Sequence, residues 1–130
     1  MKGIINFKHD TANDVIIVEP HWNIETKEDC DIWYNQWADY MSKFKKKMDV
    51  IMILDDFYVH ASIGKLWGEY RVKVLSNFTR FSYRVNSNLM TGIFVKTSGV
   101  RYNASSKEAS SIEGAVHAIK EDIKAIEISD

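Results

Sequence analysis

The sequence predicts an α/β fold: a single domain, residues 1–130, with a mixed sheet of about five strands and elements in the order ββαβαββα. Residues 50–54 form an apolar run without alternation, which is typical of a strand covered on both faces. Three further segments repeat apolar residues at spacings of three and four, as amphipathic helices do. No linker or internal repeat divides the chain, and its 130 residues suffice to bury about two-thirds of the unfolded surface.

The first two strands and the first helix follow from local signals. Residues 3–8 and 14–19 are predicted as antiparallel strands joined by a polar turn, with Pro20 at the end of the second. A helix is predicted to begin near Thr26, because Thr26 and Asp29 have the spacing of a capping box. Its apolar stripe continues to Met48 and consists of Cys30, Trp33, Trp37, Met41, Phe44 and Met48.

A run of lysines accompanies the end of this predicted helix. It consists of Lys43, Lys45, Lys46 and Lys47. We expect these side chains in the last turns, where cations complement the helix dipole. A phosphate-binding patch is the alternative interpretation.

The second half of the chain continues the alternation. Residues 50–54 supply the central strand, and a helix is predicted from about 63 to 77, with Ser62 at its N-cap or within one residue of it. Residues 79–85 alternate apolar with polar and predict a half-buried strand, and residues 89–97 predict another. The last helix is predicted to begin with a capping box of Ser110 and Glu113 and to continue through residue 126.

Composition and motifs exclude several functions. The net charge of -1 gives no general attraction to nucleic acid or to an anionic membrane. A single cysteine, Cys30, forms no internal disulfide, which favours a cytoplasmic protein. The four histidines show no metal-ligand spacing, and no phosphate-binding loop or nucleophile motif occurs. We therefore expect no metal, no cofactor and no catalytic residue.

The element order and the turn His60-Ala61-Ser62-Ile63-Gly64 resemble those of the STAS domain and its SpoIIAA-like relatives. STAS names the sulphate-transporter and anti-sigma-factor-antagonist family, in which a serine before glycine in this turn can be phosphorylated by a partner kinase. Ser62 takes the phosphoacceptor place. His60 replaces the usual Asp, Ala61 replaces the first serine, and Gly64 arrives one residue late. The resemblance implies a regulatory module of bacterial-type signalling that binds a protein, either a kinase or another regulator.

We expect the interaction face around this turn. It comprises Asp55, Asp56, Phe57, Tyr58, His60, Ser62 and Trp67. Aromatic side chains left at a surface anchor protein partners, and a phosphate on Ser62 would alter such a face. The alternative for Ser62 is a plain N-cap. The alternative for the face is a polar pocket of Asp55, Asp56, His60 and Ser62 that binds a small molecule or catalyses a reaction.

The remaining aromatic and basic residues divide between core and surface. Core positions are expected for Trp33, Trp37, Trp67 and Tyr70, whereas Trp22, Tyr34, Tyr40, Phe57 and Tyr58 are harder to bury with them. A nucleic-acid groove would use Arg71, Arg80, Arg84 and Arg101 with Tyr83 and Tyr102; a solvated strand face is the favoured interpretation. Self-association into a homodimer is left open.

Overall fold

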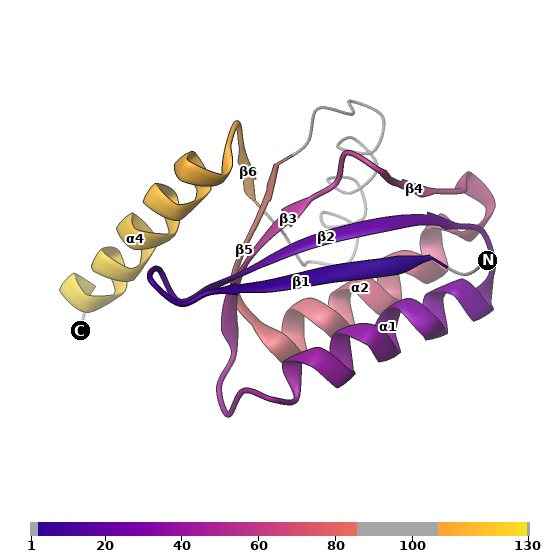
Figure 1. Ribbon diagram of the computed structural model, residues 1–130, viewed down its shortest axis with the longest axis horizontal. Coiled ribbons are helices and arrows are strands. Elements are labelled where there is room, and N and C mark those ends of the chain that lie inside the picture. Colours follow the sequence, from indigo (N-terminus) through magenta and orange to yellow (C-terminus); the bar gives the residue numbers. More distant parts are fainter. Residues whose placement is uncertain (1–2, 86–106, 130) are drawn as a thin grey trace.

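The computed structural model describes residues 3–85 and 107–129. Its strands form one mixed sheet in the order β1-β2-β3-β5-β6 (Figure 1). The short strand β4 is not part of this order and pairs with β2. The strands are β1 (Ile4–Asp10), β2 (Val15–Ile24), β3 (Met48–Ile53), β4 (Phe57–Val59), β5 (Thr79–Val85) and β6 (Lys107–Ala109). The helices are α1 (Lys27–Met41), the short 3-10 helix η1 (Ala61–Ile63), α2 (Gly64–Phe78) and α4 (Ile112–Ser129). The predicted fold class is confirmed.

β3 is the central strand, as the apolar run predicted. It pairs in parallel with β2 on one side and with β5 on the other. Val50 and Ile51 are each 0% exposed and belong to the two separate core clusters. Because successive side chains of a strand point to opposite faces, both faces of β3 must be covered.

The helices supply those two covering layers. α1 and α2 lie side by side against the larger cluster, whose members include Trp33, Trp37 and Trp67 (Figure 1). α4 packs against the smaller cluster through Ala115 and Ile119. β1 and β2 pair as an antiparallel hairpin, so the sheet is mixed. No helix in the described part of the chain is both long and apolar enough to span a membrane.

The capping box of α1 is confirmed. The Thr26 hydroxyl accepts a hydrogen bond from the Asp29 N–H at 3.1 Å, and the Asp29 carboxylate accepts one from the Thr26 N–H at 3.1 Å. The predicted end of the helix is wrong, because α1 ends at Met41 and Met48 begins β3. The four lysines thus lie in the connecting loop, and the last turn of α1 contains no basic residue.

Other boundaries also differ from the predictions. β2 continues past Pro20 to Ile24, and the short strands β4 and β6 were not predicted. Ser111, rather than Ser110, caps α4, because its hydroxyl accepts a hydrogen bond from the Gly114 N–H at 3.0 Å. The predicted strand at 89–97 lies outside the described residues.

Candidate functional site

The turn that precedes α2 is held by the side chain of His60. Its Nδ1 atom accepts a hydrogen bond from the Ser62 N–H at 3.2 Å and lies 2.8 Å from the Ser62 hydroxyl oxygen. His60 is therefore the N-cap of η1, the role that Asp, Asn or Ser usually takes. The N-cap of α2 is Ile63, without a side-chain hydrogen bond, so Ser62 lies one residue before that cap.

This geometry fixes the direction of both hydrogen bonds. Nδ1 of His60 accepts from a backbone N–H, so in this arrangement it carries no proton and the Ser62 hydroxyl donates to it. His60 and Ser62 are both exposed to solvent. No carboxylate in the described part of the chain pairs with His60. The pair thus lacks the third group that orients the base in hydrolytic triads.

Asp56 pairs with a different histidine. Its carboxylate lies 2.8 Å from Nδ1 of His21, and Nε2 of His21 lies 3.5 Å from the carboxylate of Glu19. The Trp22 N–H also donates to the Asp56 carbonyl oxygen at 3.1 Å. These contacts tie the turn after β3 to the end of β2. The pocket alternative, in which Asp56 and His60 meet, is therefore not the arrangement found.

An open cleft of about 790 Å³ lies beside this turn. It is lined by Gly3, His21, Trp22, Asn23, Glu25, Thr26, Glu28, Asp29, Asp56 and Tyr58. Asp56 and Tyr58 belong to the predicted face, whereas His60 and Ser62 do not line the cleft. Most of the ionisable groups in this lining are carboxylates, so the cleft carries negative charge.

Asp29 is a buried carboxylate in the wall of this cleft, 8% exposed. Burial alone would raise its pKa, but hydrogen bonds from the N–H groups of Glu25 and Thr26 outweigh burial, and the pKa lies below its ordinary value. Asp29 is therefore charged at neutral pH. Its partners include the backbone N–H groups of Glu25 and Thr26 at the start of α1, which gives Asp29 a structural role.

The predicted face is only partly at the surface. Asp55, Asp56, His60 and Ser62 are exposed, and Tyr58 is 46% exposed. Phe57 and Trp67 are 1% and 2% exposed, so their assignment to the interaction face is wrong. β4 alternates its side chains, which turns Phe57 inward against Trp67, at 5.6 Å between ring centroids, and Tyr58 outward.

Other aromatic residues also differ from expectation. Trp22 is 5% exposed and belongs to the core, whereas Tyr34 and Tyr40 are partly buried against it. The residues of the cleft that the sequence reasoning missed lie in the extension of β2 and at the start of α1. The apolar–polar alternation from His21 to Ile24 was the signal for that extension. It was not used, because Pro20 was interpreted as the end of the strand.

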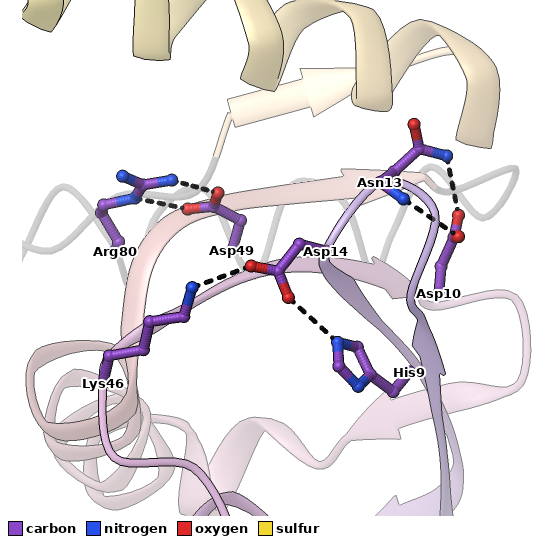
Figure 2. Close-up of polar contacts among 7 residues, drawn as sticks. All are labelled: His9, Asp10, Asn13, Asp14, Lys46, Asp49 and Arg80. Carbon is purple, nitrogen blue, oxygen red and sulfur yellow. Dashed lines mark hydrogen bonds and ion pairs between the residues drawn. The ribbon is translucent and has the colours of Figure 1, made fainter.

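The basic strand β5 does not form a solvated stripe. Arg80 donates two hydrogen bonds to the buried carboxylate of Asp49, at 2.9 and 2.6 Å (Figure 2). Arg84 is 3% exposed, and its guanidinium lies 3.8 Å from the carboxylate of Glu108. Burial and, after it, the charge of Arg84 lower the pKa of Arg71 to about 10. Arg101 and Tyr102 lie outside the described residues.

Comparison with known proteins supports the fold. No family model matches the chain, and no curated protein matches it. A solved anti-sigma factor antagonist from Mycobacterium paratuberculosis superposes with a TM-score of 0.62 at 8% identity, covering 90% of this chain and 95% of that chain. An uncharacterized protein with a SpoIIAA-like fold from Shewanella loihica PV-4 superposes with a TM-score of 0.58 at 6% identity, covering 89% and 92%. The fold that the resemblance implied, STAS-like or SpoIIAA-like, is thereby confirmed.

Proposed function

We propose that this chain is a non-enzymatic regulatory module that binds another protein through the surface that follows its central strand. This docking surface consists of Asp55, Asp56, Tyr58, His60 and Ser62. The observation that carries the proposal is Tyr58, an aromatic side chain 46% exposed between the cleft and the Ser62 turn. Aromatic anchors of this kind dominate protein-binding surfaces. The fold is one that an anti-sigma factor antagonist also has.

We further propose that Ser62 is a phosphoacceptor on this docking surface. Its side chain is exposed, and its hydroxyl hydrogen is held by His60 rather than by the core. A phosphoryl group would remove that hydrogen and add a charge of about -1.5 to -2. The added charge would lie close to Asp55 and Asp56 in sequence, on a surface that is already acidic. A partner kinase or another regulator is the corresponding partner class.

The surroundings of Cys30 and Arg80 bear on the alternative functions. Cys30 is buried, and burial raises the pKa of its thiol to about 11, which makes it a poor nucleophile. The described residues bring together no group of three or more metal-ligating side chains. The Arg80 guanidinium is paired with the Asp49 carboxylate, which neutralises its charge on this strand.

The proposal is tested with an identified partner. Chemical cross-linking at Tyr58, followed by mass spectrometry, identifies the bound protein, and calorimetry then compares the unmodified chain with Ser62→Asp and Ser62→Ala. We expect Ser62→Asp to change partner affinity while the thermal midpoint holds, since exposed substitutions alter stability by only about 0.5 kcal/mol. Ser110→Asp is the matched control, because Ser110 is also exposed but precedes α4. Equal affinity of all these forms would reject the switch.

A small-molecule site is the second candidate, and the cleft is the observation that favours it. Its volume of about 790 Å³ falls within the range of ligand pockets, roughly 300–1,000 Å³. Native mass spectrometry of the purified protein tests this candidate. A stoichiometric bound molecule, or turnover that is lost on replacing Asp56, which lines the cleft, would favour it over protein binding.

A further inference from the structure

A second open surface pocket, called the cavity below, lies at the end of the sheet opposite the Ser62 turn. Its volume is about 280 Å³. The lining residues are Met41, Ser42, Phe44, Lys45, Lys46, Lys47, Asn77 and Phe78. They come from the C-terminal ends of α1 and α2 and from the loop that leads into β3. A cavity just below the usual range of ligand pockets, roughly 300–1,000 Å³, has room for a small molecule.

The lysines of this cavity are not needed to complete the end of α1. The last four carbonyl groups of the helix already accept hydrogen bonds from the chain that follows. The donors are the N–H groups of Ser42, Lys43 and Phe44 and the hydroxyl of Ser42; the acceptors are the carbonyls of Ala38, Asp39, Tyr40 and Met41. Since these carbonyls are satisfied, capping does not account for the lysine side chains.

Two of the four loop lysines have partners. The ammonium group of Lys46 donates to the Asp14 carboxylate at 2.8 Å, which also contacts His9 (Figure 2). The ammonium group of Lys43 lies 4.4 Å from the centre of the Tyr40 ring. Lys45 and Lys47 are exposed and form no ion pair, hydrogen bond or ring contact with the part of the chain that is described. Two unneutralised cations therefore line the cavity.

The cavity also has an apolar side. Met41 is 3% exposed, and Phe44 and Phe78 are partly buried against the larger core cluster. A lysine ammonium binds phosphate as a point charge, and partly exposed rings accept a flat apolar group. We propose that this cavity binds a small phosphate monoester with an aromatic body, its phosphate at Lys45 and Lys47 and its ring on the apolar side. This site is separate from the docking surface.

Calorimetric and NMR titration of the full chain with phenyl phosphate tests the proposal. We expect saturable binding, with amide shifts centred on residues 44–47 and 77–78. The double variant Lys45→Ala/Lys47→Ala should bind at least ~10-fold more weakly, because two charge-assisted contacts are lost. The matched control is Lys8→Ala/Lys120→Ala, which removes the same charge from exposed positions outside the cavity. That control should bind within ~2-fold of the unchanged protein.

Three results would overturn the proposal. The first is the absence of saturable binding, and the second is an equal loss of affinity in both double variants. The third is inorganic phosphate binding as tightly as phenyl phosphate, which would indicate an adventitious ion only. Benzyl alcohol, which has the ring but no phosphate, should not saturate. None of these titrations involves Ser62 or Tyr58, so their outcome is independent of the proposed protein-binding function.

Discussion

At the scale of single residues, the candidate site depends on a histidine in an unusual role. N-caps are commonly Ser, Thr, Asp or Asn, because their short side chains reach a nearby backbone N–H. His60 reaches the Ser62 N–H with Nδ1 and also accepts from the Ser62 hydroxyl. Ser62 is thereby held at the surface without contributing a cap to α2.

Replacing His60 tests this arrangement. His60→Ala should lower the free energy of unfolding by about 0.5–1 kcal/mol, because the Ser62 N–H loses its acceptor at an exposed turn. His60→Asn should retain most of that stability, since the Asn oxygen can accept from the N–H two residues on. Urea denaturation at neutral pH measures both variants. Equal destabilisation by Ala and Asn would contradict the acceptor role of His60.

At the scale of elements, α1 is positioned by its first turn. Asp29 accepts hydrogen bonds from the N–H groups of Glu25 and Thr26, at 2.9 and 3.1 Å, and returns one from its own N–H to Thr26. The same turn forms a wall of the acidic cleft. The capping box therefore sets where α1 begins, and its residues Thr26 and Asp29 also line the cleft.

The lowered pKa of Asp29 makes a prediction for stability against pH. In the folded chain this carboxyl holds its proton less tightly than its ordinary pKa of 3.8 implies. The ionised carboxylate therefore contributes fully to folding stability at pH values above its ordinary pKa. The contribution is lost as the pH falls through the folded pKa. Asp29→Asn should therefore be less stable than the unchanged protein at neutral pH. The difference between their free energies of unfolding should become smaller below about pH 4. Urea midpoints across that range measure the difference. A deficit that does not change with pH would contradict the assignment.

At the scale of the whole molecule, two helical layers cover one mixed sheet, and β3 connects both cores. Val50 is fully buried, whereas Ile53 at the end of β3 is only partly buried. Val50→Asp should prevent folding, because an unpaired buried charge costs several kcal/mol against a total stability of about 5–15 kcal/mol. Ile53→Asp should fold with reduced stability. Circular dichroism of the two variants measures this, and a folded Val50→Asp protein would contradict the position of β3.

The fold was predictable from the sequence, and the details of the site were less so. The run at 50–54 and the Thr26–Asp29 pair are local signals with which the structure agrees. Residues 79–85 form the predicted strand, but it is not half-buried, because Ser82 and Arg84 at its polar positions are 8% and 3% exposed. Burial of Phe57 was not predictable in this way, because it depends on contacts between β4 and α2. Trp67, by contrast, was expected in the core from its helical spacing, and it is 2% exposed. The three-residue strand β4 has too few residues to show a period.

The loop lysines show the same limit at a helix end. The apolar stripe continued through Phe44 to Met48 in the sequence, but Met48 packs as a strand residue at 2% exposure. Spacing alone cannot distinguish a last helical turn from a loop whose apolar residues still face the core. The lysines were therefore expected in the last helical turns, where they would complement the helix dipole. The structure shows instead that backbone N–H groups already satisfy carbonyl groups at the end of α1.

The affinity of the Tyr58→Ala variant for the identified protein partner is the direct test of the docking surface. Ile126→Ala is the matched control, because Ile126 is 44% exposed on α4, outside the docking surface. We predict that Tyr58→Ala weakens partner binding by more than about 1 kcal/mol in calorimetry, while the control binds normally and both variants keep their unfolding midpoints. Unchanged affinity of Tyr58→Ala, or an equal loss in both variants, would contradict the proposed docking surface.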